Sequence, residues 1–185
     1  MPDPTQRLAL FIDGAYLSSA SRALGFEVDF KRLLEDFQSQ GTLVRAAYYT
    51  AYEDQLHAPL RALLDWLAYN GYAVIEKEIR SYLDPDGVKK KLPRIELEIA
   101  VHAMDLSSRI DGMILFSASG SFRRLVAAMQ RRGVHVTVVS TLQAPTLIVA
   151  DELRRQADKF VELRDLRLRL ERQSSAAIVR TKGRR

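Results

Sequence analysis

The sequence predicts an α/β domain with a mainly parallel sheet and helices on both of its faces. Short, continuous apolar runs such as Leu8–Ile12 and 134–140 have the length and character of strands that are buried on both faces. Segments with apolar residues at helical spacing separate these runs. Strands that alternate with helices of this length imply right-handed crossovers, and therefore a parallel sheet.

In the first half of the chain, the run LALFI is closed by Asp13-Gly14, which places Asp13 at the carboxyl end of a buried strand. Asp29 is positioned to cap a helix whose apolar face includes Leu33 and Phe37, with Gly41 placed to end it. The same patterns predict a strand over 43–49, a helix over 60–68 and a strand over 72–77.

The second half begins with a different kind of segment, 79–93, which contains the turn sequence Asp-Pro-Asp-Gly followed by basic residues. We expect an exposed hairpin or flap with a basic rim. Beyond it, the spacing predicts a helix over 96–106, a strand over 111–116, a helix over 122–132 and a strand over 134–140. The stretch 147–163 predicts a last helix and a short edge strand.

Composition excludes several classes of protein. The 185 residues suit one domain, and they contain no cysteine, which excludes disulfides, thiolate zinc sites and thiol catalysis and favours the cytoplasm. The amino terminus lacks the pattern of a signal peptide, and no apolar stretch is long enough for a membrane helix, so we expect no membrane partner. Gly14 stands alone after the first strand, which argues against a dinucleotide-binding loop.

The basic character of the protein belongs to its carboxyl-terminal end. From Arg164 to Arg185 there are eight Lys or Arg and two acidic residues, a net charge of +6, whereas residues 1–163 carry −1. Such a tail is either a solvated end or a nucleic-acid-binding arm.

The ends of two predicted strands indicate where a ligand would bind. In open α/β sheets, ligands bind beyond the carboxyl ends of the strands, at the point where the strand order reverses. This rule selects Asp13 after the first strand, together with Ser117, Ser119, Gly120 and Ser121 after the strand over 111–116. Metal-assisted phosphodiester cleavage needs clustered carboxylates there, which a neutral serine hydroxyl cannot replace.

Three motifs in order, FIDGAYL (11–17), RIELEIAVHAM (94–104) and LFSASGSFRRLV (115–126), resemble the NYN domain family, specifically its LabA-like branch. The resemblance spans 7–166 and leaves 167–185 as a basic tail. It implies a PIN-like, Rossmann-type three-layer α/β/α sandwich and metal-dependent cleavage of RNA. It also implies catalytic roles for Asp13, Glu96 and Glu98, with Asp13 and Glu96 binding Mg²⁺ or Mn²⁺.

This chain departs from the family's acidic pattern at several positions. Tyr16 stands where the family has Asn, Glu96 and His102 where it has Asp, and Ser119 and Ser121 where it has two strand-end aspartates. Glu98 and His102 are four residues apart on the predicted helix, which suits either a metal pair or an ordinary surface contact. We therefore expect any divalent cation to bind weakly.

The same region offers groups that could bind substrate. Ser117, Ser119, Gly120 and Ser121 would form an anion pocket at the amino end of the next helix, with Arg123 and Arg124 beside it, or simply a serine-rich cap. Lys89, Lys90, Lys91 and Arg94 would follow an RNA backbone, with Tyr82 for stacking, or belong to a solvated loop.

These features lead to three hypotheses. The first is a catalytically weakened or inactive NYN protein that associates with RNA or a nucleotide and acts as a regulator or as the partner of an active paralogue. The second is an active ribonuclease that uses Asp13, Glu96 and Glu98 with Mg²⁺ or Mn²⁺. The third is a protein-interaction module with the tail from Arg164 as its contact element. The resemblance alone implies a homodimer.

Overall fold

The fold is described from a computed structural model, which covers residues 5–52, 57–79, 95–144 and 146–172, and the backbone of 81–83 and 89–91. Six strands form one sheet in the order β3-β2-β1-β6-β7-β8, and every pair within it is parallel. The strands are β1 (Arg7–Asp13), β2 (Thr42–Tyr52), β3 (Ala73–Glu78), β6 (Gly112–Phe116), β7 (His135–Ser140) and β8 (Lys159–Glu162). The predicted parallel sheet is confirmed.

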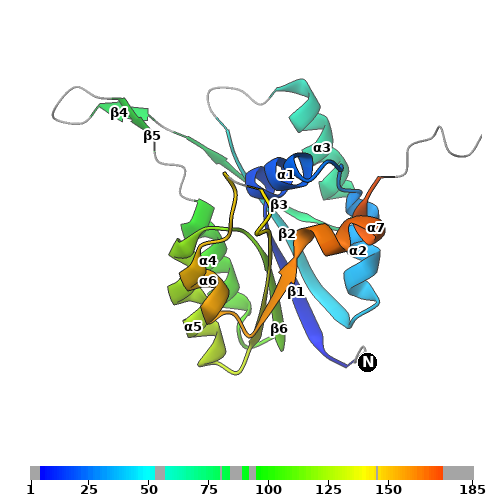
Figure 1. The fold of residues 1–185 in the computed structure, drawn as a ribbon, viewed down its shortest axis with the longest axis vertical. Helices are drawn as coiled ribbons and strands as arrows, with labels where there is room; N and C mark the ends of the chain where they lie inside the picture. The colour runs from blue at the N-terminus through cyan, green and yellow to red at the C-terminus, as the bar shows by residue number, and fades with distance from the viewer. Residues whose placement is uncertain are drawn as a thin grey trace, which may run out of the picture.

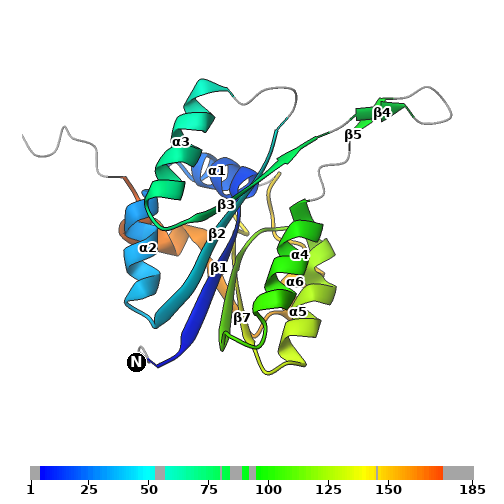
Figure 2. The ribbon, with the colours of Figure 1, turned by 180° about the vertical axis from the view of Figure 1, so that it is seen from behind.

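Helices cover both faces of this sheet and make a three-layer sandwich (Figures 1 and 2). One face carries α1 (Gly14–Ala23), α2 (Phe30–Gln38), α3 (Ala58–Tyr69) and α7 (Arg167–Leu170). The other carries α4 (Ile95–Leu106), α5 (Arg123–Gln130) and α6 (Asp151–Gln156). Each face has its own core, because successive strand residues point in opposite directions: Leu10 and Ile12 enter the first core, and Ala9 and Phe11 the second.

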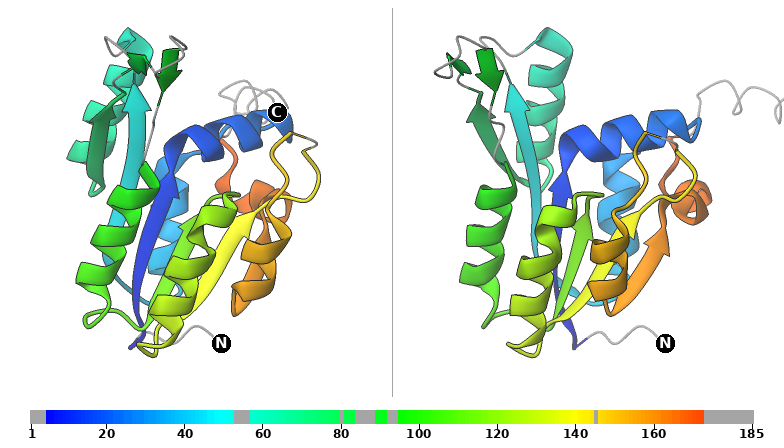
Figure 3. Two further views of the ribbon diagram at one scale, coloured as in Figure 1. Left: turned by 90° about the vertical axis from the view of Figure 1, so that its left-hand side faces the viewer. Right: turned by 60° about the vertical axis from the view of Figure 1, so that its left-hand side comes forward.

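The strand order reverses between β1 and β6. From β1 the chain moves outward through β2 to β3, then returns through α4 to β6 on the other side of β1. The carboxyl ends of β1 and β6 are therefore the switch point at which α/β proteins bind ligands. Helix α1 lies across this end of the sheet (Figure 3).

Two helical details differ from the sequence-based expectation. Helix α1 has no counterpart among the predicted elements; it begins immediately after Asp13, whose side chain caps it. The helix expected over 122–132 is shorter, because a 3₁₀ turn, η1 (Gly120–Phe122), precedes α5. The backbone therefore forms a tighter helical turn where the serine-rich motif leads into α5.

The expected hairpin is present as two short antiparallel strands, β4 (Ser81–Leu83) and β5 (Lys89–Lys91), apart from the main sheet. At the other end of the chain, η2 (Leu163–Leu166) leads into α7, which packs against α2. Leu170 has no solvent exposure, and its carbonyl accepts a 2.7 Å hydrogen bond from the N–H of Asp29. The chain thus stays attached to the body beyond residue 166, as far as Arg172. No helix in the described ranges is long and apolar enough to cross a membrane.

Candidate functional site

Asp13 stands where β1 passes into α1. Its carboxylate oxygen Oδ1 accepts a 3.0 Å hydrogen bond from the N–H of Tyr16, so the residue caps the first turn of the helix. Burial raises the pKa of Asp13 above its ordinary value, and the negative charge of Glu96 raises it further. Hydrogen bonds from the backbone N–H groups of Tyr16 and Ala15 and from Ser117 oppose these effects.

Ser117 lies beside Asp13 because of the register between β1 and β6. Ile12 is paired with Phe116, so the residues that follow them, Asp13 and Ser117, emerge together. Ser117 is almost fully buried, hydrogen bonds to Asp13 and accepts a 3.2 Å hydrogen bond at Oγ from the N–H of Ser119. The serine therefore links the ends of the two strands at the switch point.

Glu96 comes to the same place from the first turn of α4. Ile95 and Ile99, on the buried side of that helix, fix it against the core. The charge of Glu96 helps to raise the pKa of Asp13, so the two carboxylates lie within electrostatic range of each other. The structure therefore brings together three of the predicted site residues, Asp13, Glu96 and Ser117.

Two tyrosines close the rest of this end of the sheet. The hydroxyl of Tyr16 shares a 2.7 Å hydrogen bond with Ser140 Oγ and accepts a 3.1 Å bond from the N–H of Thr141, so it ties α1 to the end of β7. The ring of Tyr48 lies against Gly14, where a Cβ would be 2.3 Å from its Cζ. Burial, followed by the charge of Asp13, raises the pKa of Tyr48 to about 12. The walls of the site are thus neutral, buried phenols.

Glu98 and His102 each have a partner elsewhere. Glu98 forms an ion pair with Lys77 of β3. Nδ1 of His102 lies 2.6 Å from the hydroxyl of Tyr49. Because residues two apart on a helix do not share a face, Glu98 and Glu96 leave α4 in different directions. Glu98 therefore lies with Lys77, and not in the group formed by Asp13, Glu96 and Ser117.

The serine-rich loop has an acidic neighbour that the sequence did not indicate. A Cβ on Gly120 would lie 2.1 Å from Oε1 of Glu152, a residue in the first turn of α6. This carboxylate opposes an anion at the loop. The order of the elements could have indicated this neighbour. Helix α6 follows β7, and β7 lies beside β6, so the amino end of α6 had to lie at the same edge of the sheet as the serine-rich loop.

The profile of the NYN domain matches residues 7–166. The chain belongs to the NYN domain family. It is 31% identical over 170 residues to the low amplitude and bright protein LabA of Synechococcus elongatus, covering 90% of this chain and 88% of that protein. A crystallised protein of unknown function from Vibrio parahaemolyticus shares the fold, with a TM-score of 0.68, 23% identity and coverage of 88% of this chain and 96% of that one.

The NYN family implies a divalent metal, and such a metal needs several oxygen ligands at this end of the sheet. Asp13 and Glu96 supply two carboxylates, and the pKa of Asp13 is raised first by its burial and then by the charge of Glu96. Within the part of the chain that the structure describes, no three His, Asp or Glu residues converge as a metal site requires. This donor set does not fit a tightly bound divalent cation.

The remaining predicted residues of the NYN domain fall into two groups. Ser121, Arg123 and Arg124 are exposed, whereas Ser119 and Gly120 are half-buried at the entrance to η1. The side chains of Tyr82 and of Lys89, Lys90 and Lys91, the whole of Arg94, and residues 173–185 of the tail lie outside the described residues.

Proposed function

We propose that this NYN domain protein binds RNA, has weak or no ribonuclease activity, and acts in the cytoplasm as a regulator or as the partner of an active paralogue. The observation that carries the proposal is that, among the residues that the structure describes, Asp13 and Glu96 are the two carboxylates grouped near Ser117. Ser119 and Ser121 stand where the resemblance calls for two more. Hydroxyls cannot supply the negative charge that holds a catalytic metal, and without the metal the negative charge that develops in the transition state is not stabilised.

The support for RNA binding is the charge on the first turn of α5. Arg123 and Arg124 follow η1 directly, are exposed, and form no ion pair with any residue that the structure describes. Unpaired arginines beside the switch point suit contacts with a phosphate backbone. Since Glu152 lies against Gly120, we place the phosphate on these arginines and outside the serine loop.

The first experiment is cleavage of labelled single-stranded and structured RNAs in the presence of Mg²⁺ or Mn²⁺. We expect the protein and its Asp13→Asn variant to give the same background, because the metal site lacks charge. Metal-dependent cleavage that is lost in Asp13→Asn would overturn the proposed loss of activity and assign the protein to the active ribonucleases.

The second experiment measures RNA binding as a function of salt. We expect Arg123→Gln with Arg124→Gln to weaken binding and to lower the salt dependence by the loss of about two phosphate contacts. The matched control is Arg131→Gln with Arg132→Gln, at the other end of the same helix, about 12 Å away at 1.5 Å per residue. Absence of RNA binding in the unaltered protein would contradict the proposal and favour a protein-interaction module. An equally large loss of RNA binding in the control would contradict the placement of the RNA site at the start of α5.

A further inference from the structure

Helix α3 presents an exposed apolar face to solvent. Leu64 and Leu67 are buried in the first core and hold the helix against the sheet beside β3. In Figures 1 and 2, α3 lies at the outer edge of the molecule. At 3.6 residues per turn, the side of the helix opposite the core carries four exposed apolar residues: Ala58, Ala62, Trp66 and Tyr69. Trp66 is 40% exposed and Tyr69 is 90% exposed.

This face differs from the outward face of an ordinary surface helix, which is polar. Helix α2 follows the usual pattern, because Lys31 and Glu35 form an exposed ion pair along it. Helix α3 has 12 residues, of which only Arg61 and Asp65 are charged. Two exposed aromatic side chains on one side of such a helix indicate a surface that another molecule covers.

Arg61 and Asp65 lie one turn apart along one edge of the apolar face. Nη1 of Arg61 is 4.0 Å from Oε2 of Glu76, which is too far for a hydrogen bond. Asp65 forms no ion pair with any residue whose side chain the structure describes. The edge therefore carries one positive and one negative charge in sequence. Such an edge is complementary to a second copy of itself that runs in the opposite direction.

We propose that α3 binds the α3 of a second copy of this chain, antiparallel to it and related by a twofold axis. The axis crosses the middle of the helix and sets Trp66 beside Ala62 of the partner subunit. It also sets Tyr69 beside Ala58 of the partner subunit. Each large ring meets a small side chain, and the twofold symmetry makes each contact occur twice.

The charged edge fits the same arrangement. A twofold axis keeps each edge of one helix beside the same edge of the other, so Arg61 lies near Asp65 of the partner subunit. The residue pairs 58 with 69, 62 with 66, and 61 with 65 have midpoints within one residue of each other. One axis therefore satisfies the aromatic contacts and the ion pairs together. The ion pairs fix the direction of the helices, and the rings supply apolar burial.

The size of the surface predicts a weak dimer. Twelve helical residues at 1.5 Å each span about 18 Å, less than a standard interface of about 800 Å² per partner requires. We expect a dissociation constant on the order of tens of micromolar. Because α3 and the arginines at the start of α5 lie on opposite faces of the sheet, the dimer leaves the proposed RNA contacts open.

The first test uses Trp66, which is the single tryptophan of the chain. Sedimentation of the full chain from about 1 to 500 µM should show the mass rise from 21.0 kDa toward twice that value. Tryptophan emission should move to shorter wavelength over the same range, as the ring leaves water. Tyr69→Ala should weaken association about tenfold. Leu168→Ala, which trims an 86% exposed side chain on α7, is the matched control and should not.

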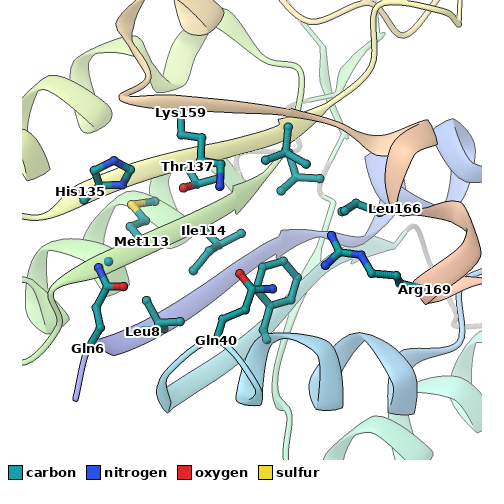
Figure 4. Close-up of a pocket in the computed structure, with 14 residues that line it drawn as sticks. Gln6, Leu8, Gln40, Met113, Ile114, His135, Thr137, Lys159, Leu166 and Arg169 are labelled. Atoms are coloured by element: carbon teal, nitrogen blue, oxygen red, sulfur yellow. The ribbon is translucent and has the colours of Figure 1, made fainter. Parts of the chain in front are cut away.

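The second test exchanges the charges. Arg61→Glu makes the edge wholly acidic and Asp65→Lys makes it wholly basic, so each variant alone should associate about tenfold more weakly. An equal mixture of the two should associate again, because each acidic edge then meets a basic one. Lys159→Glu is the control: it reverses an exposed cation that lines a groove on β8, at the other edge of the sheet from β3 (Figure 4). It should associate like the unaltered protein.

Three results would each overturn the proposal: a monomer at every concentration, association without a change in the emission of Trp66, or a mixture of the charge variants that stays monomeric. Circular dichroism checks that every variant is folded. No RNA is present in these measurements, so their outcome is independent of the proposed function.

Discussion

The hydroxyl of Tyr49 lies 2.6 Å from Nδ1 of His102, in the layer between β2 and α4. Burial, followed by the charge of Glu98, raises the pKa of Tyr49 well above its ordinary value, so the phenol stays protonated and donates. Burial and the charge of Arg45 lower the pKa of His102, with Asp105 opposing them. The folded protein therefore favours the neutral imidazole, which can accept at Nδ1.

This pair makes stability depend on pH. Because His102 is harder to protonate in the folded than in the unfolded protein, its contribution is complete above the unfolded pKa of about 6.5 and is lost as the pH falls below it. We expect the free energy of unfolding in urea to decline less steeply below pH 6.5 in His102→Gln than in the unaltered protein. Identical slopes in the two proteins would contradict the prediction.

Asp13→Asn should stabilise the protein near pH 7 in the absence of divalent cations. The pKa of Asp13 is raised, so its ionisation disfavours the folded state, and stability is lost as pH rises from about 4 through the folded pKa. Asn caps a helix as well as Asp does. Thermal unfolding at several pH values should show a higher midpoint for the variant at pH 7 and no difference near pH 3. A lower midpoint for the variant at pH 7 would show that the charged carboxylate stabilises the folded protein as a helix cap by more than its burial destabilises it.

Gly14→Ala should destabilise the protein by about 3 kcal/mol, the upper end for an overpacked core. The added Cβ would meet Cζ of Tyr48 at 2.3 Å, and that ring is buried and cannot withdraw. Gly120→Ala is the comparison, because its added Cβ meets the end of the flexible, exposed Glu152 side chain, and it should cost less than about 1 kcal/mol. Urea unfolding measures both changes. In a Tyr48→Leu background the cost of Gly14→Ala should shrink; simple additivity would rule out the contact as its cause.

Ser119→Asp with Ser121→Asp should create a response to Mn²⁺. The new carboxylates would join Asp13 and Glu96, so their repulsion lowers the unfolding midpoint in a chelator, and bound Mn²⁺ raises it by mass action. Ser119→Asn with Ser121→Asn matches the size without the charge and should not respond. A double-Asp variant that is indifferent to Mn²⁺ would mean that the loop does not face the group of Asp13 and Glu96.

Glu152→Gln should tighten RNA binding by about threefold, since it removes one exposed negative charge beside the proposed phosphate contacts. Fluorescence anisotropy at low and high salt provides the measurement, because the gain should fade as salt screens the charge. Asp151→Asn, on the same turn but ion-paired with Arg155, is the control. A gain that persists at high salt would point to a change of loop shape.

The sequence predicted the arrangement of the sheet well for a physical reason. Buried parallel strands are continuous apolar runs, so 8–12, 111–116 and 134–140 could be recognised locally, and the helices between strands implied parallel crossovers. Helix α1 was missed because its residues, Gly14 to Ala23, are small and mixed in character, and its first turn depends on the Asp13 cap. Asp13 was correctly placed at the end of the first strand, but the residues after it lack the apolar spacing that would have indicated a helix to cap.

The candidate site was predictable only in part. The proximity of Asp13 and Ser117 follows from parallel register, and the family resemblance added Glu96. The ion pair of Glu98 with Lys77 depends on how α4 is rotated over β3, and the position of Glu152 depends on the packing of α6 against η1. The rotation and packing of a helix depend on tertiary contacts, which the spacing of residues in a single sequence does not predict.

Tyr16 also affects which mutational routes are open to this domain. Its hydroxyl is a partner of two fully buried residues, Ser140 and Thr141, so a shorter side chain such as Asn would leave a buried hydroxyl and an amide without that partner. Such losses cost about 1–3 kcal/mol each. Asn at position 16, as in the family pattern, would therefore cost this domain stability unless the end of β7 changed with it.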